Sequence, residues 1–303
     1  MGELTDSVEK AVATGLFPRA EKLLVACSGG ADSVALAAAV ARHGAPPMAI
    51  GHVDHGLRPE SAGEAEQVRA LAGKLGVPFF LERLQGFSTR EAGLEAAARE
   101  GRYAALARLA AQARAPVVAT AHTRRDQAET LLLRLIRGAG PGALAGVRRR
   151  RELAPGIALV RPLLEVPRSA TEAYCAEQGL AYVDDPHNSD PARMRARLRA
   201  LWPQLLELNP RLEEALAGAA QLFADEDELL TELAAAADLR NAHPALQRRA
   251  LLQEALQAGL RPERKHVEKL RELLGRGGAV DMPGGRARVV FDAVRQRRDS
   301  SRK

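Results

Sequence analysis

Six consecutive residues near the start of the chain have the composition of a phosphate-binding loop: Ser28, Gly29, Gly30, Ala31, Asp32 and Ser33. Paired glycines allow a tight turn, and successive backbone N–H groups at the start of a helix bind anions. The segment has neither the lysine nor the Gly-Lys-Ser/Thr ending of a Walker A loop. We therefore expect a nest for pyrophosphate with Asp32 as a ligand of Mg²⁺, because a bare carboxylate would repel phosphate. The alternative is an ordinary turn before a helix that Ser28 or Asp32 caps.

A second polar segment, His122 to Thr130, enters a run of residues that is typical of a helix. Asp126 and Glu129 are three residues apart, so they share one face of that helix. An acid pair at this place could hold a second Mg²⁺. The alternative is that both acids only stabilise the start of the helix through its dipole.

Two further segments carry side chains that could bind ligands. His52 to Arg58 contains two histidines, but no cysteine or third ligand lies nearby in the sequence, so the segment alone gives little support for a metal site. Arg195, Arg197 and Arg199 form a basic row, and guanidinium groups suit bidentate contacts with phosphates or carboxylates. The same row is also consistent with a solvated helix face.

Short apolar runs alternate with Ala/Leu-rich helical runs in the first half of the chain, and these elements would position the polar segments. Four strands are predicted: Lys22 to Cys27, Met48 to Asp54, Pro78 to Leu84 and Pro116 to Ala121. The alternation predicts an α/β fold, with a parallel sheet and flanking helices. In such folds ligands bind at the carboxyl ends of the strands, which is where both polar segments fall.

The regularity loosens after Gly140. Leu159 to Val166 is a candidate for a further strand, and a helix is expected from Arg168. A basic helix with one apolar stripe is predicted from Arg193 to Leu208, and Asn209-Pro210 marks its end. We place the domain boundary there. Residues 1–208 would form the large domain, and residues 209–303 a smaller, mainly helical domain with a Gly-rich hairpin-like stretch and a charged tail.

The composition is that of a folded globular protein, with 46% hydrophobic and 27% charged residues in 303. Two cysteines cannot form a disulfide framework or a cysteine-based metal cluster, which fits a reducing cytoplasm. The first twenty residues contain three acids and no continuous apolar core, so we expect neither a signal peptide nor a membrane helix. The net charge of +6 favours phosphate-rich partners only weakly, because it is a small excess of 44 basic over 38 acidic residues.

Several of these motifs resemble those of one enzyme family, in the same order. Residues 28–33 are similar to the SGGxDS loop of the N-type ATP pyrophosphatases, the Rossmann-like PP-loop superfamily. The segments 52–58, 122–130 and 137–140 are similar to the HVNHGLR, HxxDDxxET and RGxG motifs of the tRNA(Ile)-lysidine synthases. Residues 185–188 and 195–199 look like that family's DPSN and RNxxR motifs. The resemblance spans residues 22 to 210.

This resemblance implies roles for individual residues. Asp32 and Asp126 would be catalytic and hold Mg²⁺, and residues 28–33 would bind the pyrophosphate part of ATP. Arg125 stands where the family has the first aspartate of its pair, which puts metal binding or adenylation in question. Asp54, His187 and Ala196 are further departures from the motifs. Contacts with the substrate pocket or with RNA would come from His55, Arg58, His122, Glu129, Arg137, Arg195 and Arg199.

A member of this family is expected to be a cytoplasmic ligase. It would use ATP and Mg²⁺ to adenylate the wobble cytidine of tRNA(Ile) with the anticodon CAU, and free L-lysine would then displace AMP to give lysidine. No membrane is expected as a partner, and the oligomeric state stays open, a homodimer included. The alternatives are another PP-loop tRNA-modifying or amide-forming adenylating enzyme, or a catalytically weakened nucleotide- or RNA-binding protein. A 2-thiocytidine synthase is disfavoured because the chain lacks paired cysteines.

Overall fold

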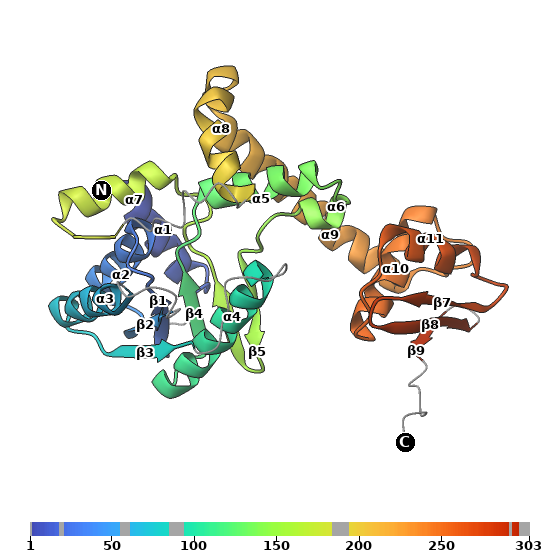
Figure 1. Cartoon of the computed structure of the whole chain (residues 1–303), viewed down its shortest axis with the longest axis horizontal. Helices are drawn as coiled ribbons and strands as arrows, with labels where there is room; N and C mark the ends of the chain where they lie inside the picture. The colour runs from blue at the N-terminus through green and yellow to red at the C-terminus, as the bar shows by residue number, and fades with distance from the viewer. Residues whose placement is uncertain are drawn as a thin grey trace. The chain divides into compact units, whose positions relative to one another are not determined.

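The computed structural model describes residues 2–17, 21–54, 61–84, 94–183, 194–290 and 293–296 (Figure 1). Side chains are described for these residues except 61–62, 94–98, 290 and 293–296. The chain divides into two compact units, Met1–Gln221 and Leu222–Lys303. The division lies within one helix, α9 (Leu212–Ala236), so this helix begins in the first unit and ends in the second.

The first unit contains a six-stranded sheet in the order β3-β2-β1-β4-β6-β5. All neighbouring strands are parallel except β5 and β6, which are antiparallel. The strand order reverses direction at β1, since β2 and β4 lie on its two sides, and ligands bind at such switch points in open α/β sheets. The strands are β1 (Leu23–Ala26), β2 (Met48–Asp54), β3 (Phe79–Arg83), β4 (Val117–Thr120), β5 (Arg150–Ala154) and β6 (Ile157–Val160).

The parallel sheet with flanking helices is confirmed, and each of the four predicted strands forms. The further strand predicted from Leu159 to Val166 is misplaced, because β6 ends at Val160. Pro162 has no backbone N–H to donate to a strand, and the chain turns there. The antiparallel β5 was not expected from its arginine-rich sequence, which lacks a run of apolar residues.

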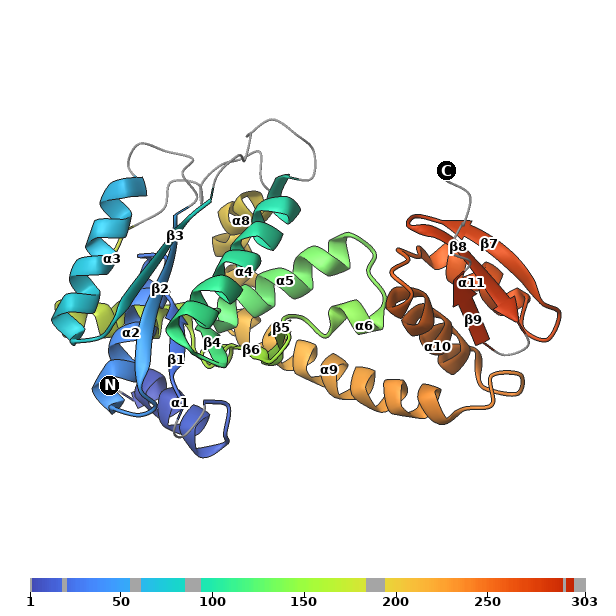
Figure 2. The same ribbon diagram turned by 90° about the horizontal axis from the view of Figure 1, so that it is seen from below.

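Helices cover both faces of this sheet (Figure 2). Alternate residues of the central strand face opposite layers: Leu23 and Val25 pack with one set of helices, and Leu24 packs with another. The first set is α1 (Gly2–Ala13), α2 (Ala31–His43), α3 (Ser61–Leu75) and α7 (Arg168–Glu177), and the opposite face carries α4 (Leu94–Ala113).

A separate apolar cluster joins α5 (Arg124–Ile136), α8 (Met194–Leu208) and the beginning of α9. Ala128, Leu198 and the buried Trp202 lie at its centre, and Leu212 and Leu216 pack against it. A short helix, α6 (Pro141–Leu144), follows α5. This cluster fixes α8 over the start of α5, which is the segment that carries Asp126 and Glu129.

The second unit combines helices with a small antiparallel sheet. Its core includes Leu251, Leu270, Val280 and Val289. The Gly-rich hairpin-like stretch forms β7 (Gly278–Met282) and β8 (Gly285–Val290), and Arg295, predicted to begin a charged tail, lies instead in β9 (Ala293–Gln296). The helices are the later part of α9, α10 (Pro244–Gln257) and α11 (Arg264–Glu272). Within the described ranges, no helix is long and apolar enough to cross a membrane.

Candidate active site

The phosphate-loop segment follows β1 and leads directly into α2, as its sequence predicts. Gly30 is the N-cap residue of α2, and no side chain makes a capping hydrogen bond there. Neither Ser28 nor Asp32 therefore acts as the N-cap residue that the alternative interpretation required. The start of α2 presents backbone N–H groups and the positive end of a 13-residue helix toward the sheet's carboxyl edge, which suits an anion.

The loop is held in shape by its own side chains. Ser33 Oγ donates to the backbone oxygen of Gly30 at 2.9 Å and accepts from the backbone N–H of Ser28 at 3.1 Å. Gly29 has φ of +94°, a conformation that residues with a Cβ rarely adopt. Its carbonyl accepts from the backbone N–H of Val183 at 2.9 Å. Ser28, Gly29 and Ser33 therefore hold the loop in the shape of an anion-binding nest.

Asp32 lies in the first turn of α2, and its Oδ1 accepts a hydrogen bond from Thr171 Oγ1 of α7. Burial raises the pKa of the Asp32 carboxyl above its usual value; the Thr171 hydrogen bond and Arg168 oppose this rise, whereas Asp126 adds to it. The charge of Asp126 therefore acts on Asp32, although the two residues are 94 positions apart in the sequence.

The Thr171 hydrogen bond gives a testable pH dependence. In Thr171→Val, the pKa of Asp32 should rise further, because valine keeps the shape of threonine but cannot donate to the carboxylate. The sequence predicts that Asp32 acts as the ionised form, and on that prediction the acidic limb of the pH–rate profile for pyrophosphate release should move to higher pH. Thr171→Ser, which keeps the hydroxyl, is the matched control. An acidic limb at the same pH in all three proteins would contradict this role of Thr171.

Asp126 performs the helix-start function that the alternative interpretation proposed, but with one oxygen only. Its Oδ2 accepts from the Thr123 backbone N–H at 2.9 Å and from Thr123 Oγ1 at 3.2 Å, completing a capping box for α5. Its Oδ1 lies 3.9 Å from Arg199 Nη2. Asp126 Oδ2 therefore caps α5, while Oδ1 lies near Arg199 of α8.

The pKa values of His122 and Asp126 are both lowered, which leaves the histidine neutral and the aspartate charged. Burial lowers the pKa of His122 to about 3, although Asp126 favours its charged form, so the ring is neutral near pH 7. Burial by itself would raise the pKa of Asp126, but His122, the Thr123 backbone N–H, Arg195 and Arg199 together hold it below its usual value. Asp126 is thus an anion at neutral pH, and His122 can act only as a neutral hydrogen-bonding group. His122 Nδ1 already lies 3.0 Å from Thr120 Oγ1.

Glu129 is the buried centre of a cluster of arginines. Its side chain is fully buried, and its Oε1 accepts from Arg199 Nε at 2.8 Å and from Arg125 Nε at 3.3 Å. Arg195 Nε lies 3.6 Å from Oε2, which accepts no hydrogen bond from any described residue. Arg195 also donates to Thr130 Oγ1 at 3.1 Å. These contacts show that Arg195 and Arg199 are not simply a solvated row.

The row divides by helix geometry. Arg195 and Arg199 are four residues apart on α8 and face α5, whereas Arg197, between them, is exposed. The sequence could not distinguish these faces with certainty, because the partner acids are on a different helix, about 65 to 70 residues earlier in the chain.

A second arginine cluster, around Tyr103 of α4, was not predicted from the sequence. The Arg151 guanidinium lies 4.4 Å from the Tyr103 ring centroid, and the fully buried Arg161 donates to its hydroxyl at 3.4 Å. Burial would raise the pKa of Tyr103, but Arg99, Arg161 and Arg102 lower it to about 8. The sequence did contain an indication, since Arg99, Arg102 and Tyr103 stand three and four residues apart in an Ala-rich helix.

This cluster extends toward the residues around Glu129. Burial lowers the pKa of Arg134, and the positive charges of Arg99 and Arg195 lower it further. The same two arginines also lower the pKa of Arg102, after the larger effect of burial. Guanidinium groups that repel one another in this way are stabilised when an anion binds between them. The surface from α4 to α8 is therefore suited to a phosphate-bearing ligand.

One of the predicted contact residues, Arg137, is not brought to this group, and two others cannot be placed. Arg137 is exposed and lies at the C-cap of α5, so the helix separates it from Asp126 by about 17 Å. His55 and Arg58 lie outside the described residues, and their roles stay predictions. The neighbouring His52 is buried, and its Nδ1 lies 2.8 Å from the carbonyl oxygen of Cys27, which links β2 to the start of the phosphate loop.

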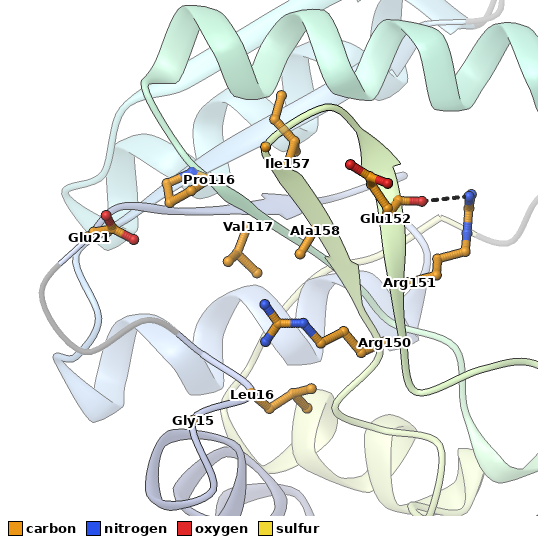
Figure 3. Close-up of a pocket in the computed structure, with 11 residues that line it drawn as sticks. Gly15, Leu16, Glu21, Pro116, Val117, Arg150, Arg151, Glu152, Ile157 and Ala158 are labelled. Carbon is orange, nitrogen blue, oxygen red and sulfur yellow. Dashed lines mark hydrogen bonds between the residues drawn. The ribbon is translucent and has the colours of Figure 1, made fainter. Parts of the chain in front are cut away.

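Two cavities differ sharply in their lining. The larger, about 630 Å³, lies at the amino ends of β4 and β6, where Figure 3 shows Arg150 extending toward Leu16. None of the predicted site residues lines it. The other, about 340 Å³, has charged side chains of both signs; its lining residues are Arg125, Glu129, Arg168, Ser169, Glu172, Arg199 and Glu213.

Comparison with known proteins agrees with this geometry. The chain matches the model of the PP-loop domain over residues 3–205 and that of the TilS substrate binding domain over residues 235–299. A tRNA(Ile)-lysidine synthase of Salinispora arenicola is 43% identical, with 92% of this chain and 90% of that protein covered. One of Thermus thermophilus is 42% identical over 88% of this chain but 54% of its own length.

Among solved structures, the U34-tRNA thiolase NcsA of Methanococcus maripaludis matches with a TM-score of 0.59. The two chains are 15% identical, and the match covers 73% of this chain and 78% of the thiolase. At this identity the likeness supports the fold alone. The two matched domain models and a relative that is 43% identical over 92% of this chain establish more than the fold: this chain belongs to the tRNA(Ile)-lysidine synthase family.

Proposed function

We propose that the protein ligates lysine to C2 of the wobble cytidine of tRNA(Ile) with a CAU anticodon, using ATP. The observation that carries this proposal is a link through α7: Thr171 donates to Asp32 of the predicted phosphate loop, and Arg168, Ser169 and Glu172 of the same helix line the pocket of mixed charge. A nucleotide phosphate site and an amino-acid site that adjoin each other are what an adenylating ligase needs. Membership of the family supplies the chemical identity of the substrates.

The reaction would proceed in two displacements. The C2 oxygen of cytosine attacks the α-phosphorus of ATP, the bond to the β-phosphate oxygen breaks, and pyrophosphate leaves. The ε-amine of lysine, after losing a proton, then attacks C2, and the C2–O bond breaks to release AMP. The target base must leave its stack to reach the loop, as in other enzymes that act on nucleobases.

Asp32 and Asp126 fit a role as ligands of Mg²⁺. Both offer carboxylate oxygens, the donor type that Mg²⁺ prefers, and the charge of Asp126 contributes to the raised pKa of Asp32. When bound there, the cation would neutralise charge on the departing pyrophosphate. Within the described residues, no group of three or more His, Cys, Asp or Glu side chains that could hold a metal ion occurs.

The mixed-charge pocket supports lysine as the amino-acid substrate. An α-amino acid carries an ammonium and a carboxylate, and the pocket presents groups of both complementary signs. Glu129 and Glu172 can pair with an ammonium, whereas Arg168 and Arg199 can pair with a carboxylate. Glu129 Oε2, buried and without a hydrogen bond among the described residues, is the acceptor that an incoming ammonium would satisfy.

The arginines around Tyr103 support an RNA partner. Besides burial, the charges of Arg99 and Arg195 lower the pKa values of Arg102 and Arg134, and RNA phosphates would relieve that repulsion. We assign the second unit to tRNA binding as well, because residues 235–299 match the substrate binding domain of the family. A tRNA substrate places the protein in the cytoplasm, and sedimentation of the purified protein would test a homodimer.

Sulfur transfer is the less suitable chemistry for this site. Cys27 and Cys175 are both buried and free. Burial raises the pKa of the Cys27 thiol, and it also raises that of Cys175 to about 11, so neither is a ready thiolate nucleophile at neutral pH.

Analysis of the modified tRNA tests the proposal directly. After reaction with ATP, Mg²⁺ and isotope-labelled lysine, nuclease digestion should give one nucleoside with the mass of cytidine plus lysine minus one water. The label should be at the wobble position. Unmodified cytidine after complete consumption of ATP would contradict the proposed transfer.

A further inference from the structure

Arg125 occupies a position where the HxxDDxxET motif has an aspartate, and the substitution reverses the charge at the edge of the pocket. An unpaired guanidinium there would compete with a cationic substrate for Glu129. The side chain is not unpaired, however, and its contacts indicate a different role.

Three groups from three helices fix the Arg125 guanidinium. Its Nε lies 3.3 Å from Glu129 Oε1 on the same helix, and its Nη1 donates to Glu213 Oε1 of α9 at 3.1 Å. Its Cζ lies 4.2 Å from the ring centroid of Trp202 on α8, a cation–π distance. The side chain is 21% exposed, as is that of Glu213, while Glu129 is fully buried. Arg125 lines the pocket, and restraint from three directions leaves its guanidinium little freedom to move there.

The charges of this group are balanced by Glu213. Arg125, Arg195 and Arg199 provide three positive charges, and Glu129 and Asp126 provide two negative ones. The third negative charge comes from Glu213 in the first turn of α9. Glu213 also lines the pocket, so the carboxylate missing at position 125 is matched by one from another helix.

We propose that Arg125 is a positioning residue that holds Glu129 in place for the amino-acid substrate, and that Glu213 is its obligatory partner and the pocket's replacement carboxylate. This inference rests on the proposed function, because lysine is taken as the ligand of the pocket. It predicts that the two residues work as a pair, so that restoring the family's aspartate alone harms the enzyme.

A charge-reversal cycle tests the pair. Arg125→Asp would place three carboxylates together without their central cation, and we expect the KM for lysine to rise about tenfold or more. The lysine-independent release of pyrophosphate should be affected much less than the KM for lysine, because Asp32 and the phosphate loop are untouched. Glu213→Arg alone should also raise the KM. The double variant R125D/E213R, in which the pair is reversed, should recover most of the loss.

Arg211→Asp provides the matched control, since Arg211 pairs with Glu214 at the same end of α9 but both side chains are exposed. Its KM for lysine should equal that of the wild type. If Arg125→Asp does not fold, Arg125→Lys and Arg125→Gln replace it. Of these two, Arg125→Lys retains the positive charge and should have the lower KM for free lysine. Melting temperatures identify variants whose fold is damaged.

Three results would overturn the inference. The first is a lower KM for lysine in Arg125→Asp, which would mean that Arg125 only obstructs the pocket. The second is equal loss in both half-reactions, and the third is a double variant no better than either single one. Failure of the proposed function is a separate result, because the wild-type protein itself would then release no AMP on addition of lysine.

Discussion

Replacing Asp32 by alanine is expected to abolish pyrophosphate release while leaving the protein folded. The rate should fall by at least about 10²- to 10³-fold, because the substitution removes a preorganised charge from the place where the triphosphate and its cation would bind. Burial already disfavours the ionised carboxyl, so its removal relieves a desolvation cost. Without Asp32, the single hydroxyl hydrogen of Thr171 can be donated to the carbonyl oxygen of Arg168, 2.7 Å away, which also favours an intact fold. Pyrophosphate release with the cognate tRNA and the melting temperature measure the two effects.

Two variants make that result specific. Asp32→Asn keeps the size of the side chain and should be nearly as inactive, since the charge is what matters. Asp6→Ala removes an exposed acid from α1 and should retain full activity. Residual turnover close to the wild-type value in Asp32→Ala would remove Asp32 from the catalytic machinery.

The largest loss of stability is expected from Glu129→Ala. The substitution removes the fully buried carboxylate between Arg125, Arg195 and Arg199 and leaves three guanidinium groups to repel one another. Breaking a buried ion pair by removing one partner costs about 3–5 kcal/mol. We expect about 3 kcal/mol in the free energy of unfolding, because the arginines are 21–35% exposed and water can solvate them in part. Denaturant titration measures this change.

Glu129→Gln separates stability from substrate binding. Glutamine keeps the shape, and its amide oxygen can still accept hydrogen bonds, so it should cost less stability than alanine. It should still weaken lysine binding, since an amide does not pair with an ammonium as a carboxylate does. The matched control is Glu214→Ala, which breaks an exposed ion pair and should change stability by less than about 1 kcal/mol. Equal stabilities for Glu129→Ala and Glu214→Ala would contradict the central place of Glu129.

The elements that hold the phosphate loop were predictable because their information is local. The apolar run before Ser28, the paired glycines and the helical run after Ser33 each specify their own conformation, and the structure places them as strand, turn and helix. The same holds for Asp126, whose capping contact is with a residue three positions away. The predicted catalytic role of Asp32 and Asp126 is a separate matter and stays a prediction.

The contacts that could not be predicted are long-range. Arg125 looked like the loss of a carboxylate because its partner Glu213 is 88 residues later in the chain. The charged run at Arg150 did not resemble a strand, since its pairing with β6 is set by tertiary contacts and not by apolar alternation. Tyr103 contacts Arg161, which is 58 residues later in the chain. Such pairings depend on packing between elements, which a single sequence does not state.

Lysine-dependent formation of AMP from ATP and Mg²⁺ tests the central claim most directly. It should be measured with the CAU-anticodon isoleucine tRNA and, in parallel, with the methionine tRNA that has the same anticodon. We predict AMP only when the isoleucine tRNA and lysine are both present. If no AMP forms with either tRNA, or if the same amount forms without lysine, the assignment of the phosphate loop and the mixed-charge pocket to one ligase site is contradicted.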